Sequence, residues 1–124
     1  MQDKDTERTL QVAMHCLDEH KASDISYLDV SEYTPFALYY VLATCMNIRQ
    51  LGAMVEHLED EFAKNDIEVL AKDGIPDSGW MIIQGGDVIV HLFLDVNRKE
   101  VDIEGLIMDM ANRAQKAKSK KKSK

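Results

Sequence analysis

The sequence predicts an α/β (α+β) domain in which helices flank a mixed sheet of about five strands. Two patterns lead to this prediction: segments in which apolar residues recur every three or four positions, and short runs of strand-forming residues separated by turn signals. A chain of 124 residues, 45% of them hydrophobic, has the size and composition of one domain. We therefore predict one domain over residues 1–112 and a Lys-rich disordered tail over residues 113–124.

The first three predicted elements are a helix and two strands. Apolar side chains share one helical stripe over residues 6–20, which must pack on another element. Strand-forming residues dominate residues 24–30 and 37–44. Pro35 marks the connection between the two strands, because proline lacks a backbone donor.

A second helix and a short strand follow. Asn47 and Gln50 have the spacing of a capping box, which predicts a helix that begins after Asn47. Its apolar face ends near Asn65. Residues 67–71 then predict a short strand, and residues 72–79 consist of turn-forming residues.

The last predicted elements are a hairpin and a short helix. Residues 80–84 and 88–94 form its strands, and Gly85-Gly86-Asp87 forms the turn between them. The nearly unbroken apolar runs in both strands predict a position at the centre of the sheet, covered on both faces. Apolar spacing predicts a helix over residues 101–110.

The charge is unevenly distributed along the chain. The whole chain has 15 bases and 22 acids, a net charge of −7. Seven of the bases lie in the last twelve residues, so residues 1–112 have 8 bases and 22 acids, a net charge of −14. An acidic body argues against non-specific DNA binding and favours a basic partner. The tail is either a solubilising extension or a flexible arm that contacts RNA phosphates.

The cysteines and the apolar segments indicate a soluble, cytoplasmic protein. Cys16 and Cys45 lie in different predicted elements without metal-ligand spacing, which excludes a disulfide scaffold and a zinc ribbon. Residues 1–9 have no apolar run of a secretory signal. The apolar-rich residues 36–46 are half as long as a membrane span, so no membrane partner is predicted.

The sequence predicts no catalytic residue, metal site or cofactor. Paired carboxylates that could share a cation are missing from the strands. Asp24 and Asp29 bracket the first strand, where capping is the favoured role. Gly85-Gly86-Asp87 precedes a strand rather than a helix, so it is a hairpin turn and not a phosphate loop.

The histidines favour structural roles. His91 lies in the apolar run of residues 88–94, where a core hydrogen bond is favoured over a role as catalytic base. His15, His20 and His57 are predicted at the surface or at the boundary of the core, and no two of them have the spacing of four that a helical metal site needs.

Trp80, the single tryptophan, has two equally weighted interpretations. It follows a turn and opens a hairpin strand, so its ring could lie at the rim of the sheet near Asp77 and Asp87 and anchor a basic partner. The alternative is packing in the core.

Several segments together resemble the ribosomal silencing factor family, also called Iojap-like. The matching segments span about residues 6–110: Asp24-Ile-Ser-Tyr-Leu-Asp-Val30, Tyr39-Tyr-Val-Leu-Ala-Thr44, Arg49-Gln50, Asp73-Gly74, Gly79-Trp80 and Gly86-Asp-Val-Ile-Val-His-Leu-Phe93. The resemblance implies a small domain with the shape of a nucleotidyltransferase but without catalysis. It also implies binding to the fourteenth protein of the large ribosomal subunit, which blocks small-subunit joining and represses translation under nutrient limitation.

The resemblance also implies which residues bind the partner. The matching positions are Trp80, Met81, Ile82, Asp87, His91, Arg49 and Gln50. The chain departs from the family pattern where the family usually has an acid, a small residue or an aromatic: Leu38, Cys45, Asn47, Gln84, Glu100, Val101 and Ile107. These departures reduce the acidic and aromatic surface expected to contact a basic ribosomal protein.

Three further expectations follow. A diverged nucleotidyltransferase-like enzyme and an RNA-binding module that acts through the Lys-rich tail are the alternative functions. Contact of that tail with ribosomal RNA is compatible with the silencing function. Exposed sheet edges and helix faces in the family imply self-association as a homodimer.

Overall fold

The computed structural model describes residues 2–122, with side-chain surroundings for residues 5–113. Its helices and strands are α1 (Gln2–Glu19), β1 (Ser23–Asp29), β2 (Tyr39–Cys45), α2 (Ile48–Lys64), β3 (Val69–Asp73), the 3₁₀ turn η1 (Pro76–Ser78), β4 (Trp80–Gly85), β5 (Val88–Leu94), α3 (Asp95–Val101) and α4 (Ile103–Lys122). The strands form one sheet in the order β1-β2-β5-β4-β3. β2 and β5 are parallel, and the other neighbours are antiparallel. The predicted mixed five-stranded sheet is confirmed.

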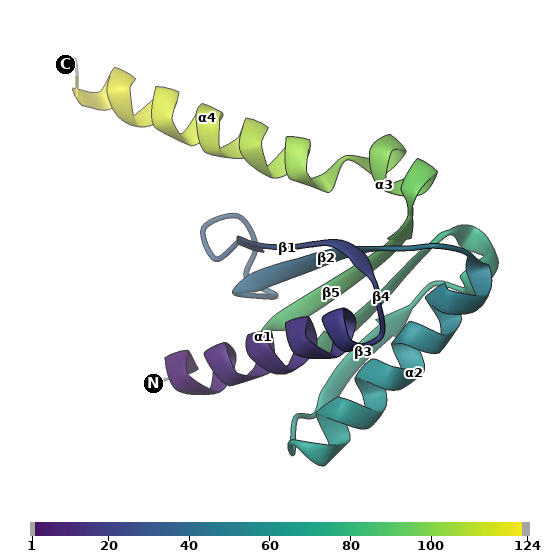
Figure 1. The fold of residues 1–124 in the computed structure, drawn as a ribbon. Helices are drawn as coiled ribbons and strands as arrows, with labels where there is room; N and C mark the ends of the chain where they lie inside the picture. The colour runs from purple at the N-terminus through teal and green to yellow at the C-terminus, as the bar shows by residue number, and fades with distance from the viewer. Residues whose placement is uncertain (1, 123–124) are drawn as a thin grey trace.

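The two faces of the sheet carry different helices. Figure 1 shows α1 and α2 on one side of the sheet and α4 on the other, leading away from it. The larger core lies beneath α1 and α2 and includes Leu17, Leu58 and Phe62. A smaller cluster on the opposite face is built on Leu42, Phe93 and Ile103. Because strand side chains alternate between faces, each central strand contributes to both clusters.

The predicted capping of α2 is confirmed, with one difference. The Asn47 carboxamide oxygen accepts from the Gln50 amide at 2.8 Å, and Asn65 caps the other end. Gln50 Oε1 accepts from the Met46 amide at 2.5 Å rather than from that of Asn47. Gln50 Nε2 also donates to the carbonyls of His20 and Lys21, both at 3.3 Å. Gln50 therefore joins the start of α2 to the end of α1.

The observed boundaries of several helices and strands differ from the predicted ones by a few residues. α1 begins at Gln2, four residues earlier than the apolar stripe indicates, because polar residues also extend a helix. β2 begins at Tyr39, two residues later than predicted. β3 covers Val69–Asp73 instead of residues 67–71, so part of the predicted turn is paired with β4.

The C-terminal region differs most from the prediction. α3 was not predicted, because its N-cap Leu94 has no capping side chain that a sequence pattern could reveal. Asp102 adopts a left-handed conformation (φ 51°) and separates α3 from α4. α4 continues to Lys122, whereas the sequence predicted a helix over residues 101–110 and a disordered tail. Alanine and lysine are strong helix formers, which accounts for the extension. Residues 123–124 lie outside the described residues.

Gly85→Ala is expected to lower the free energy of unfolding by about 1–2 kcal/mol. A Cβ atom on Gly85 would lie 2.8 Å from the ring of Phe62, a fully buried residue of α2. The methyl group would displace this ring from its packed position. Urea denaturation of the variant measures the loss.

A double variant distinguishes this clash from a backbone effect. Phe62→Leu replaces the ring that the new methyl group meets with a smaller side chain. Gly85→Ala should therefore lower the free energy of unfolding by less in the Phe62→Leu background than in the wild-type protein. Equal costs in both backgrounds would contradict the clash.

Candidate functional site

Strand alternation divides the predicted partner-binding residues between the two faces. Ile82 and His91 are cross-strand partners, and Trp80 pairs with Phe93 in the same way. These four residues lie on the face that α4 partly covers. Met81 lies on the opposite face and packs against the core beneath α1 and α2.

Four rings on this side of the sheet form a surface that we name the aromatic face: Tyr40, Trp80, His91 and Phe93. The Trp80 ring stacks on Phe93 with a centroid separation of 5.3 Å, and the Tyr40 and His91 centroids are 4.5 Å apart. Trp80 Nε1–H donates to His91 Nδ1 at 3.2 Å. Trp80 is half-buried, so its ring combines features of the two predicted positions, rim and core.

His91 is buried and neutral at neutral pH. His91 is 5% exposed, and this burial lowers the pKa of its imidazole from 6.5 to about 4. Because Nδ1 accepts from Trp80, the proton of the neutral ring is on Nε2. Nε2 is buried and has no hydrogen-bond partner among the described residues. The hydrogen bond to Trp80 agrees with the structural role that the sequence predicts for His91.

The remaining predicted partner-binding residues lie away from the aromatic face. Asp87 is exposed in the β4–β5 turn, where its side chain accepts from Thr6 Oγ1 at 3.4 Å. Arg49 is exposed in the first turn of α2. Gln50 makes the structural bonds between α1 and α2. The structure therefore brings together Trp80, Ile82 and His91, and places the other four residues elsewhere.

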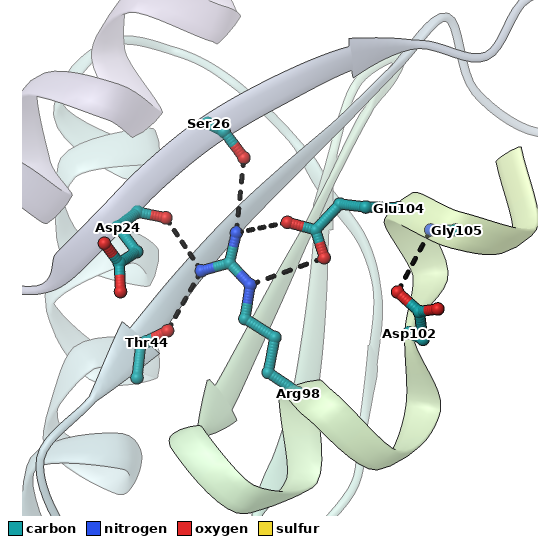
Figure 2. A network of polar contacts seen from close by, with 7 residues as sticks. All are labelled: Asp24, Ser26, Thr44, Arg98, Asp102, Glu104 and Gly105. Carbon is teal, nitrogen blue, oxygen red and sulfur yellow. Dashed lines mark hydrogen bonds and ion pairs between the residues drawn. The ribbon is translucent and has the colours of Figure 1, made fainter. Parts of the chain in front are cut away.

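A polar cluster around Arg98 holds the C-terminal helices on the sheet (Figure 2). Its centre is Arg98 of α3, whose side chain is 12% exposed. Its guanidinium donates to Glu104 Oε2 at 2.6 Å and to Glu104 Oε1 at 3.5 Å. It also donates to Thr44 Oγ1 at 2.9 Å, to the Asp24 carbonyl at 2.7 Å and to Ser26 Oγ at 3.3 Å. One side chain thus links α3, α4, β1 and β2.

Sequence reasoning missed Tyr40, Phe93 and the Arg98 cluster. Tyr40 and Phe93 lie in correctly predicted strands, and strand alternation could have identified them as neighbours of Leu42 and His91. Arg98 has no local signal, because its partners in β1 and β2 are 54 to 74 positions away.

Arg98→Ala is expected to lower the free energy of unfolding by about 1–2 kcal/mol, because Thr44 and Glu104 lose a charged donor. Amide hydrogen exchange should also accelerate in the first turns of α4. Urea denaturation and hydrogen exchange measure both effects.

Lys99→Ala is the matched control. Lys99 is exposed and forms an i,i+4 ion pair with Asp95, so its loss should change stability by less than about 0.5 kcal/mol. Arg98→Lys should not restore stability, since an ammonium cannot reproduce the guanidinium fork. Equal effects of Arg98→Ala and Lys99→Ala would contradict the linking role.

The other polar candidates have structural surroundings. Asp29 accepts from the amide and hydroxyl of Ser31, and these bonds lower the pKa of its carboxyl group. Cys16 and Cys45 are buried free thiols, and burial raises the pKa of each to about 11. The rings of His20 and His57 stack at 3.7 Å.

The described part of the chain has neither a metal-ligand cluster nor a membrane-spanning helix. Among residues 5–113, whose side-chain surroundings the structure describes, His, Cys, Asp and Glu side chains do not gather in threes around a point where a metal ion could bind. None of the helices described there has the length and apolar content to cross a bilayer.

Comparisons with known proteins agree on one family. The model of a family described as "Ribosomal silencing factor during starvation" matches residues 3–124. Proteins named as ribosomal silencing factors from Chromobacterium violaceum and Bacillus subtilis are each 28% identical, over 96 and 97 residues. The matches cover 77% and 78% of this chain and 79% and 82% of those proteins. The crystal structure of a Chromobacterium violaceum protein superposes with a TM-score of 0.77 at 27% identity, covering 81% of this chain and 83% of that one.

Proposed function

This chain belongs to the ribosomal silencing factor family, and we propose that it binds the large ribosomal subunit at its fourteenth protein and prevents the small subunit from joining. Translation would thereby be repressed when nutrients are limiting. The family match over residues 3–124 is the observation that carries the proposal. The relatives are named as regulatory factors rather than as enzymes.

Charge supports a partner of this kind. Residues 1–112 have a net charge of −14, and a ribosomal protein that is embedded in RNA is basic. Complementary charge accelerates the encounter of two proteins more than it strengthens the final complex. The acidic body should therefore speed association with the subunit at low salt.

The aromatic face supplies the apolar part of the proposed interface. Trp80 is half-buried, and tryptophan is enriched among residues that dominate binding energy. Ile82 and His91 adjoin it on the same face, whereas Arg49, Gln50 and Asp87 would contribute from outside this face. Met81 packs against the core on the opposite face, so its contribution to the contacts would be small. We propose that the subunit contacts centre on Trp80.

The proposed mechanism is steric and involves no catalytic step. A folded domain seated on the subunit-joining surface occupies the space that the small subunit needs. This mechanism requires no nucleotide or metal ion, and it implies a cytoplasmic location with the ribosomes. Addition of ATP or GTP with Mg²⁺ should leave the melting temperature unchanged; a rise would favour the nucleotidyltransferase-like alternative.

Co-sedimentation with isolated ribosomal subunits tests the proposal. The protein should pellet with large subunits and not with small subunits, and preincubated large subunits should form fewer complete ribosomes. Absence from the large-subunit pellet would contradict the proposal.

A charge-reversed variant tests the contribution of the tail. Lys120→Glu, Lys121→Glu and Lys122→Glu together remove three positive charges from the region that we propose to contact ribosomal RNA. The variant should still select large subunits but bind them more weakly and with a smaller salt dependence. Complete loss of binding would instead favour an RNA-binding module that acts through the tail.

We also propose that free copies associate as homodimers. Leu106 and Met108 on α4 are 55% and 66% exposed, and Leu70 on the edge strand β3 is 55% exposed. Exposed apolar side chains and free strand edges favour self-association. Sedimentation velocity at increasing concentration should show a dimer; a monomer at all concentrations would contradict this.

A further inference from the structure

A cavity of about 270 Å³ lies between the aromatic face and α4. Its lining comes from the sheet, from the segment before β2, from the end of α3 and from the first turns of α4: Tyr33, Thr34, Tyr40, Trp80, His91, Val101, Ile103, Leu106, Ile107 and Met110. None of these described residues carries a charge, since the imidazole of His91 is neutral at pH 7. The cavity therefore disfavours an ionic ligand.

His91 gives this cavity a buried nitrogen without a hydrogen-bond partner among the described residues. Its Nδ1 is occupied by Trp80 Nε1–H, so the ring nitrogen that carries the proton is Nε2. Nε2 is buried without a hydrogen-bond partner among the described residues. A buried donor without an acceptor costs free energy, which an acceptor atom supplied from the cavity would recover.

We propose that this cavity binds a small neutral molecule that has an apolar, ring-sized body and one carbonyl-type acceptor for His91 Nε2–H. The inference goes beyond the ribosomal function and does not depend on it. The size of the cavity suits a ligand of about ten heavy atoms, since an apolar cavity of about 150 Å³ already accepts benzene. The ring would lie among Tyr40, Trp80 and Ile107, with its acceptor directed at His91.

Two isosteric probes separate the hydrogen bond from apolar contact. Acetophenone has a ring and a carbonyl oxygen, whereas α-methylstyrene has a methylene group in place of that oxygen. Amide chemical shifts of the isotope-labelled full-length protein give the affinity of each probe. The Nε2 resonance of His91, observed through long-range proton–nitrogen correlation, should shift with acetophenone and not with α-methylstyrene. An unchanged Nε2 resonance at saturating acetophenone would overturn the proposed hydrogen bond.

His91→Phe removes the donor. The ratio of the acetophenone to the α-methylstyrene dissociation constant should be about tenfold higher in the variant than in the wild-type protein. The two probes differ in apolar transfer by the same amount in both proteins, so this difference cancels when the two ratios are compared. An unchanged ratio would overturn the role of His91. The Nε2 measurement on the wild-type protein decides the question if this variant does not fold.

Ile107→Trp fills the cavity from α4 without altering His91. Both probes should lose binding at least tenfold, while the amide spectrum of the sheet remains folded. Val96→Trp is the matched control, because Val96 is 62% exposed on α3 and does not line the cavity. Absence of binding to the wild-type protein, or equal binding to the Ile107→Trp and Val96→Trp variants, would overturn the site.

Discussion

Lowering the pH from 6.5 to 4 is expected to reduce the free energy of unfolding by about 3 kcal/mol through His91. The folded protein holds the pKa of this imidazole at about 4, mainly because burial disfavours the charged ring. In the unfolded chain the pKa returns to near 6.5. Between these values the unfolded state binds a proton that the folded state does not, so this contribution is complete above pH 6.5 and falls as the pH approaches 4.

Urea denaturation across this pH range measures the effect. Acidification acts on the whole protein, so the informative quantity is the difference between the wild-type protein and His91→Phe. The variant should be less stable at pH 7, because Trp80 Nε1–H loses its acceptor, and its stability should fall less steeply on acidification. His15→Gln, at an exposed surface position, should keep the wild-type slope. Parallel profiles for wild type and His91→Phe would contradict the assignment.

Trp80→Ala is expected to weaken binding to the large ribosomal subunit by about 2 kcal/mol or more, roughly a 30-fold rise in Kd. This prediction rests on the proposed function. The half-buried Trp80 ring stacks on Phe93, so it can present one side to a partner while the other is held in place. Quantitative co-sedimentation with large subunits measures the change in Kd.

Two controls separate binding from folding. Trp80→Phe retains a ring on Phe93 but removes the donor to His91, so it should bind more tightly than Trp80→Ala. Met81→Ala removes a partly buried side chain on the opposite face, so it should lower stability and leave subunit affinity within about threefold of wild type. A loss of affinity for Met81→Ala equal to that for Trp80→Ala would place the interface elsewhere.

Local signals explain why much of the fold could be predicted. The boundaries of α2 follow from Asn47 and Asn65, which cap it through bonds to residues within four positions. The hairpin of β4 and β5 was predicted from a turn and two apolar runs that adjoin it. Such interactions depend on residues close in sequence, so a pattern can reveal them.

The candidate site could be predicted only in part. Trp80 and His91 were predicted from the family resemblance. They lie eleven positions apart in the sequence, and the register of the hairpin brings them within hydrogen-bonding distance. The addition of Tyr40 depends on the parallel pairing of β2 with β5, in which Tyr40 lies opposite Ile89 and Leu42 opposite His91. Parallel strands are joined by long connections, so local sequence does not specify which strands pair.

The sequence by itself determined the mixed α/β class, the capped α2, the central hairpin and the acidic charge of residues 1–112. The tertiary structure alone decided that Arg98 joins the C-terminal helices to β1 and β2, that Met81 faces away from Trp80, and that a cavity lies beneath α4. The physical reason is the range of the interactions. Caps, turns and apolar periodicity act within a few residues, whereas a buried guanidinium or a shared cavity requires side chains that only strand order and register bring together.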